Sequence, residues 1–343
     1  MNRTPLQSLV CCSLLALATA CGDLPDDRPA AASEPRPSVD AQGGGGGAPV
    51  DLEPAGGRGG TGGTSPAQGG GGGAGEPTEP VQTVSLADVA LFINAGDSIA
   101  AGYDAAGNNG PGGKGYARLL LSNHPDYGAY GAAHLSAVAS GVDFRDLSES
   151  GATSDEIRAD LQARIDSFPA VVDGDVLLTI SAGGNDFNDN VLVMVSPQLA
   201  AQVAANLRSN LATMIALVRD RYEDPALGKE VFVVLQTIHD PTGGTGSVPL
   251  VFDDGFCEVL RNPLLQPVAP LALDNLELVN EAIRAEAADQ GAFLSDNHQL
   301  FLDHGMNAPG AQRWLSGDCA HPTSEGHHQI RREMWGVLTG QRL

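Results

Sequence analysis

The C-terminal three quarters of the chain alternate short, nearly continuous apolar runs with longer segments of helical periodicity. The apolar runs predict strands at 89–94, 142–147, 175–180, 230–238 and 292–294. Apolar residues spaced three and four apart predict helices at 116–121, 154–165, 203–218, 273–283 and from Pro322 to about Leu338. Strands that are apolar along their whole length are buried on both faces. The alternation therefore predicts an α/β protein, a three-layer α/β/α sandwich around a central parallel sheet.

The first twenty residues have the pattern of an export signal. Arg3 supplies positive charge, Leu9 to Ala18 form an apolar core, and Ala18-Thr19-Ala20 is a small-residue cleavage site. The apolar run is shorter than the ~20 residues that span a bilayer. The segment from Leu17 to Cys21 resembles a bacterial lipoprotein cleavage box, in which the cysteine is lipidated, although Ala18 stands where a larger aliphatic residue is usual. We expect a lipid anchor on Cys21; simple secretion and an unmodified cysteine are the alternatives.

Residues 21–83 have a different composition. Glycine runs at 43–47 and 69–73 are separated by Pro, Ala, Ser and Thr, with almost no large apolar side chains. Such a segment cannot offset the entropy of ordering, so we predict a flexible tether with an r.m.s. span on the order of 40 Å. The alternative interpretation is a linker whose length is not under selection. Residues 84–343 then form one domain.

The net charge of −23, from 19 Lys+Arg against 42 Asp+Glu, bears on the partners of this domain. Acidic proteins are repelled by nucleic acids and by anionic lipid headgroups. We therefore expect no nucleic-acid partner, and contact with a membrane only through the lipid anchor. The charge does not exclude a neutral ester or sugar substrate. We expect a monomer.

Polar segments that follow the predicted strands contain the parts of an active site. Gly96-Asp97-Ser98 follows the first strand, and Asp318 precedes His321 by three residues near the C-terminus. A serine, a histidine and an aspartate are the components of a catalytic triad. Gly151 follows the second strand and Asn185 the third, and both offer N–H donors for an oxyanion. The carboxyl ends of parallel strands share one edge of a sheet, so these residues are expected to meet.

These four segments resemble the conserved blocks of the GDSL or SGNH hydrolase superfamily. Its first block matches Gly96-Asp97-Ser98-Ile99, with Ile99 in place of the leucine, and its second-block glycine matches Gly151. Its Gly-x-Asn-Asp block matches residues 183–186 and its Asp-x-x-His block matches residues 318–321. The resemblance implies a flavodoxin-like sandwich that needs no metal and no cofactor. It further implies that Ser98 is the nucleophile, His321 the base and Asp318 its orienting carboxylate. The Ser98 N–H, the Gly151 N–H and the Asn185 side chain would form the oxyanion hole.

Three other motifs in the sequence do not meet the requirements of the sites that they resemble. Ala100 stands where the last glycine of a Gly-x-Ser-x-Gly elbow would be. The glycine pattern at 110–115 follows no strand, so it does not indicate a dinucleotide site. A calcium loop beginning at Asp186 would need a glycine at Val191 and a glutamate at Pro197.

Two further features of the sequence bear on this predicted site. Cys257 and Cys319 are the only cysteines of the folded domain, and in an exported protein they predict a disulfide worth roughly 4 kcal/mol, which would pin the loop of Asp318 and His321. Two free thiols are the alternative. The segment from Asp240 to Leu271 fits no regular element and is longer than most connections. It is a surface insertion near the site that either shapes the substrate cleft or is a flap without substrate contact.

The predicted function is that of an exported serine ester hydrolase acting on short-acyl or acetyl esters. Lipase or lysophospholipase activity on lipid esters is the alternative within the same chemistry. A non-catalytic surface binding protein on a degenerate hydrolase fold is the alternative from another class. The substrate would be a small-molecule, carbohydrate or lipid ester. The protein would be held at the cell envelope by its anchor, or secreted.

Overall fold

The computed structural model describes residues 83–189, 191–248, 267 and 269–342. The predicted export signal, Cys21 and Cys257 lie outside the described residues, as does nearly all of the predicted tether. The predictions made for them remain predictions. Within the described ranges, no helix has the length and apolar character needed to cross a membrane.

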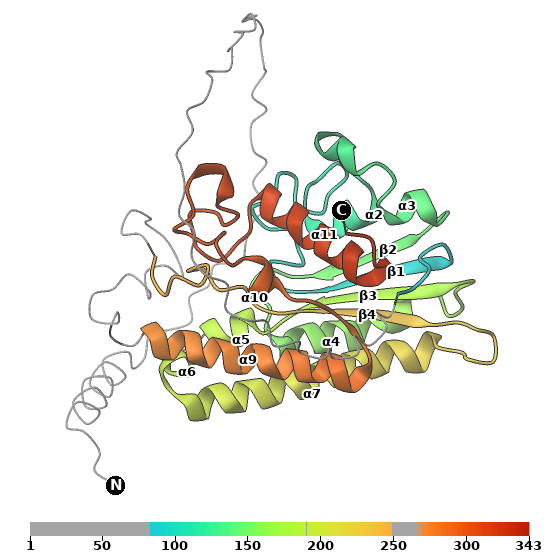
Figure 1. Ribbon diagram of the computed structural model, residues 1–343. Coiled ribbons are helices and arrows are strands. Elements are labelled where there is room, and N and C mark those ends of the chain that lie inside the picture. Colours follow the sequence, from blue (N-terminus) through green and yellow to red (C-terminus); the bar gives the residue numbers. More distant parts are fainter. Residues whose placement is uncertain (1–82, 190, 249–266, 268, 343) are drawn as a thin grey trace, which may run out of the picture. The chain divides into compact units, whose positions relative to one another are not determined.

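Five parallel strands form one sheet with the order β2-β1-β3-β4-β5 (Figure 1). Each strand begins and ends within two residues of its predicted run. The interior strand β1 is apolar because both of its faces are covered: Leu91, Phe92 and Ile93 are fully buried. The predicted parallel α/β sandwich is confirmed. The strands are β1 (Val89–Gly96), β2 (Asp143–Ser148), β3 (Asp175–Ser181), β4 (Val231–Gln236) and β5 (Phe293–Ser295).

Helices cover both faces of the sheet (Figure 1). One layer consists of α4 (Ser154–Arg164), α5 (Gly184–Asn188), α6 (Val191–Val195), α7 (Pro197–Tyr222) and α9 (Ala269–Gln290). The opposite layer contains α2 (Tyr116–Leu121), α3 (Leu135–Val138) and α11 (Ser324–Thr339). The short helix α10 (Asn297–Leu300) follows β5.

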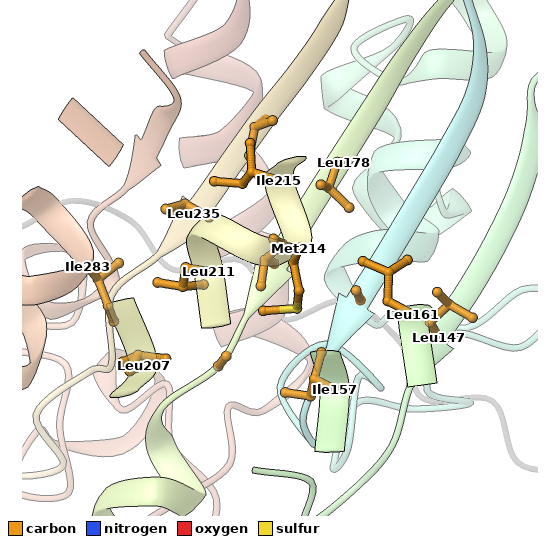
Figure 2. Close-up of a cluster of buried hydrophobic side chains, with 14 of the residues drawn as sticks. Leu147, Ile157, Leu161, Leu178, Leu207, Leu211, Met214, Ile215, Leu235 and Ile283 are labelled. Carbon is orange, nitrogen blue, oxygen red and sulfur yellow. The ribbon is translucent and has the colours of Figure 1, made fainter. Parts of the chain in front are cut away.

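The core beneath α4, α7 and α9 holds the apolar stripes that the sequence pattern singled out. Figure 2 shows Leu207, Leu211 and Met214 of α7 packed toward side chains of the sheet, including Leu178 and Leu235. All five are at most 2% exposed. Each such side chain stabilises the fold by about 1.5–3 kcal/mol relative to an exposed one. Helix α7 is 26 residues long, and this burial explains why its inner face carries few charges.

Three helix starts differ from the predictions. Helix α7 begins at Pro197, six residues before the predicted start at 203. Helix α11 begins at Ser324 rather than at Pro322, because Thr323 accepts a hydrogen bond from the Gly326 N–H as an N-cap and Pro322 pairs in an extended bridge with Leu315. Helix α9 begins at Ala269, inside the segment predicted to be irregular as far as Leu271. Pro270 fits the first turn of this helix, where the missing N–H of a proline needs no partner.

Several one- and two-turn helices were not predicted. They comprise α3, α5, α6 and α10, and the 3₁₀ helices η1 (Pro125–Tyr130), η2 (Ile165–Ser167) and η4 (Gly310–Gln312). Segments this short contain too few residues to show a helical period.

The strand order places a crevice at the carboxyl edge of the sheet. After β1 the chain adds β2 on one side and then crosses to add β3 on the other side of β1. At such a reversal the connections leave in opposite directions and open a crevice outside the strand ends. The segments that follow β1, β2 and β3 are those that carry Ser98, Gly151 and Asn185.

Candidate active site

The turn after β1 presents Ser98 at this edge. Gly96 ends the strand with a φ of +151°, and a Cβ atom there would lie 2.4 Å from the carbonyl oxygen of Ser181. Only glycine fits such a close approach of two strands. The Asp97 N–H donates to that same carbonyl at 3.1 Å, which fixes the turn. Ser98 follows directly and lines a cavity of about 110 Å³.

The loop before α11 brings Asp318 and His321 together. One carboxylate oxygen of Asp318 accepts hydrogen bonds from the N–H groups of Ala320 and His321, each at 3.0 Å, and from the Ser316 hydroxyl at 2.6 Å. The other oxygen contacts Nδ1 of His321. The three-residue spacing therefore forms a closed turn in which the carboxylate orients the imidazole.

Ser98 and His321 lie within hydrogen-bonding distance although 223 residues separate them: Oγ of Ser98 is 2.8 Å from Nε2 of His321. Because Nδ1 faces a carboxylate, it carries a proton, and Nε2 is left to accept the Ser98 proton. Burial would raise the pKa of Asp318, but hydrogen bonds from the His321 ring and the Ser316 hydroxyl hold it well below its usual range. The carboxylate is therefore ionised throughout the neutral range.

The two residues predicted to complete an oxyanion hole lie on adjoining turns. Asn185, in the first turn of α5, lines the same cavity as Ser98 and His321. Its Nδ2 donates to the carbonyl of Ala152 at 2.9 Å, so one N–H of the amide is engaged and the other remains for a ligand. Gly151 precedes that carbonyl in an exposed turn with a φ of +87° and is not among the residues that line the cavity.

Asp97 is a buried acid whose environment the sequence did not reveal. It is 4% exposed, and its carboxylate accepts hydrogen bonds from the Ser181 hydroxyl at 2.9 Å and the Ile99 N–H at 3.0 Å. Desolvation raises the pKa of Asp97 to about 6, although these hydrogen bonds lower it. A titratable group thus lies directly beside Ser98. Its place in the first block was visible in the sequence, but its burial against β3 was not.

His239 also lines the cavity, although it belongs to none of the sequence motifs. Its ring stacks on Phe301 with centroids 4.9 Å apart, and burial lowers its pKa to about 4, so it is neutral above pH 5. The available signal was its position three residues after the end of β4, at the same edge of the sheet as Ser98.

Cys319 is fully buried between Asp318 and Ala320 and lines the cavity. Its predicted partner Cys257 lies outside the described residues, so the disulfide remains a prediction. In the ranges that the structure describes, one group of three His, Cys, Asp or Glu side chains is close enough to hold a metal ion: Asp104, Asp318 and His321. Because Asp318 and His321 already bond each other, a metal there would compete with the Ser-His-Asp arrangement.

A parallel α/β sandwich with these side chains at its switch point has the architecture of an ester-hydrolase class of enzyme. Residues 95–329 match the model of the GDSL-like Lipase/Acylhydrolase family, and the chain belongs to that family. The match contains all four blocks that the sequence suggested, from Ser98 to His321.

Solved structures with a similar fold include several lipolytic enzymes. An extracellular lipase from Streptomyces rimosus is 19% identical, with a TM-score of 0.45 over 70% of this chain and 96% of that one. The lipase Lip_vut3 from a goat rumen metagenome is 16% identical, with a TM-score of 0.47 over 73% and 97%. A phospholipase A1 from Streptomyces albidoflavus NA297 is 19% identical, with a TM-score of 0.42 over 70% and 95%. No curated protein matches the sequence significantly.

Proposed function

We propose that this protein is an exported serine hydrolase that cleaves short-acyl esters. The observation that carries the proposal is the continuous contact from Ser98 through His321 to Asp318, with Oγ of Ser98 2.8 Å from Nε2 of His321. A serine hydroxyl is a weak nucleophile unless a base takes its proton. Here the base is correctly oriented and its other nitrogen faces an ionised carboxylate.

The first half of the reaction acylates Ser98. Nε2 of His321 takes the hydroxyl proton while Oγ bonds to the ester carbonyl carbon, and the carbonyl oxygen becomes an oxyanion. The N–H groups of Ser98 and Gly151 and the free N–H of Asn185 stabilise that charge. The carbon–alkoxide bond then breaks, and the His321 imidazolium gives its proton to the leaving alcohol.

The second half restores the enzyme. His321 takes a proton from water, and the hydroxide oxygen attacks the acyl carbon to form a second oxyanion. The bond to Ser98 breaks, and Oγ recovers its proton from His321 as the carboxylic acid leaves. Each step moves a proton between Nε2 and an oxygen, so the low pKa of Asp318 matters: the carboxylate keeps its charge when the imidazole gains one.

The size of the cavity favours a short acyl group. Its volume of about 110 Å³ is smaller than the ~150 Å³ of a cavity that holds benzene. Phe187, Ile238 and Leu276 supply apolar lining beside Ser98 and His321. The small volume supports an acyl chain of a few carbons as the group that this space holds.

Replacement of Ser98 with Ala tests the proposal. The variant should fold normally, lose turnover of p-nitrophenyl acetate by a factor on the order of 10⁶, and no longer react with a fluorophosphonate probe. Ser85→Ala, at an exposed serine, is the matched control and should keep both properties. Normal turnover by Ser98→Ala would refute the proposal. A wild-type protein that neither turns over esters nor reacts with the probe would instead be a binding protein.

We also propose that Cys21 carries a lipid and that residues 22–83 tether the domain to the cell envelope. The support is the signal-like sequence before Cys21 and the glycine-rich composition after it. In a bacterial host, wild-type protein should incorporate labelled palmitate and fractionate with membranes. Cys21→Ser should be unlabelled and soluble. Wild-type protein without label would mean secretion without an anchor.

The predicted bond between Cys257 and Cys319 belongs to the same proposal. Cys319 is buried next to Asp318, so a bond there would restrain the catalytic loop. In processed Cys21→Ser protein, a denatured sample should show no thiol that reacts with iodoacetamide until it is reduced. Reduction of the native protein should lower activity before it lowers the melting temperature. Two reactive thiols in the unreduced sample would exclude the bond.

A further inference from the structure

The loop that follows Ser98 packs against His321. The ring of Tyr103 lies on the ring of His321, with centroids 4.4 Å apart and planes tilted by 47°. Tyr103 is anchored at both main-chain groups. Its N–H donates to the Ser98 carbonyl at 3.0 Å, and its carbonyl accepts from Nε2 of His327 at 3.0 Å. The position of this segment relative to His321 is therefore fixed by the turn after β1 and by α11 together.

The next residue brings a second carboxylate to the imidazole. One oxygen of Asp104, one oxygen of Asp318 and a ring nitrogen of His321 all lie within 4.8 Å of one another. Asp104 is exposed and has a left-handed backbone, with a φ of +63°. Aspartate and asparagine tolerate this conformation better than most residues do. This proximity was not predictable from the sequence, because Asp104 belongs to none of the four blocks.

We propose that Asp104 is a positioning residue for the catalysis by His321: its negative charge stabilises the imidazolium that forms when Ser98 loses its proton. The inference depends on the proposed role of His321 as the base. Asp318 orients the ring through Nδ1, whereas Asp104 makes no hydrogen bond to the ring and acts through charge alone. Opposite charges less than about 5 Å apart attract even at the high dielectric constant of an exposed site.

The other titratable groups around His321 do not obscure this effect. His239, after β4, and His327, on α11, both have pKa values lowered to about 4 by burial, so they are neutral above pH 5. Asp318 is ionised. Asp97, from the turn after β1, has a pKa raised to about 6 by burial and titrates in the working range. It remains unchanged when Asp104 is replaced, so the difference between two pH profiles reports Asp104.

The test is Asp104→Asn, which removes the charge and suits the left-handed backbone. Asp303→Asn is the matched control, because Asp303 is also exposed and has a φ of +64°. Profiles of kcat/KM for p-nitrophenyl acetate would be measured from pH 4.5 to 9, in 20 mM and in 1 M NaCl. At low salt the acid limb of Asp104→Asn should move down by about half a pH unit, and its plateau should fall about threefold. Both differences should vanish in 1 M NaCl, where the screening length is ~3 Å.

Three results would overturn the inference while leaving the serine mechanism in place. The first is an unchanged profile at low salt. The second is a loss that persists in 1 M NaCl, which would mean that Asp104 supports the loop structurally. The third is an activity that responds to EDTA or to added Ca²⁺ in the wild type but not in Asp104→Asn, which would indicate a cation site. Full activity of Ser98→Ala would remove the proposed function itself, which is a separate outcome.

Discussion

The side-chain amide of Asn185 donates a hydrogen bond to the main-chain carbonyl of Ala152 at 2.9 Å. This bond joins the turn after β2 to the helix that follows β3, two segments that lie more than thirty residues apart. It uses one N–H of the amide and thereby fixes the direction of the other. An oxyanion donor is effective when it is held in place before the reaction begins.

Asn185→Ala should therefore lower kcat strongly. We expect a loss of ~10²–10³ in kcat with little change in KM, because the missing interaction forms mainly in the transition state. Steady-state kinetics with p-nitrophenyl acetate would measure both constants. Asn307→Ala is a suitable control, since Asn307 is exposed and donates hydrogen bonds to Thr245 and Ser247. A kcat within threefold of the wild type would exclude Asn185 from the oxyanion hole.

Gly96→Ala should destabilise the fold. The new Cβ would lie 2.4 Å from the Ser181 carbonyl oxygen at a φ of +151°, so we expect a loss of at least ~3 kcal/mol in the free energy of unfolding. Gly112→Ala provides the comparison, because Gly112 also has a positive φ, of +72°, but no atom within 4 Å of the added carbon. That variant should lose only ~1 kcal/mol. Urea unfolding would compare the two, and equal losses would contradict the close approach at Gly96.

Asp97 should make stability depend on pH. Burial raises its folded-state pKa from 3.8 to about 6. The folded state thus favours the protonated acid, and the resulting stability is fully present below pH 4 and is lost as pH rises through 6. Asp97→Asn cannot ionise. The stability of the wild type relative to this variant should fall by roughly 2–3 kcal/mol between pH 4 and pH 8. Urea unfolding at both pH values would test this, and a constant difference would show that Asp97 has an ordinary pKa.

Leu276→Ala should shift the preference of the enzyme toward longer acyl chains. Leu276, on α9, is 3% exposed and lines the cavity beside Ser98. Removing its side chain adds room for about three carbons, so kcat/KM for hexanoate relative to acetate should rise at least ~10-fold. This ratio does not depend on the folded fraction, so the expected loss of stability does not affect it. Leu227→Ala, at a leucine that is 69% exposed, should leave the ratio unchanged. An unchanged ratio in Leu276→Ala would place the acyl chain elsewhere.

Much of the fold follows from local patterns. The strands were predictable because a parallel strand buried on both faces is apolar along its length, as in Leu91, Phe92 and Ile93. The long helices were predictable because one face must be apolar, as Leu207, Leu211 and Met214 show. The short helices were not, and neither was the start of α11, where the hydroxyl of Thr323 rather than the ring of Pro322 sets the boundary. A cap of this kind depends on one hydrogen bond and leaves no repeated pattern.

The candidate site, like the fold, was only partly predictable from the sequence. Sequence alone determined that Ser98, Gly151, Asn185, Asp318 and His321 are present in the order of the family blocks. It determined that Ser98, Gly151 and Asn185 share one edge of the sheet as well, because parallel strands end together. Only the tertiary structure brought Tyr103 onto the ring of His321, Asp104 beside it, and Leu276 into the cavity. Those contacts join a loop after β1, a loop before α11 and a helix before β5. Their geometry depends on how whole layers pack, which no local spacing of residues records.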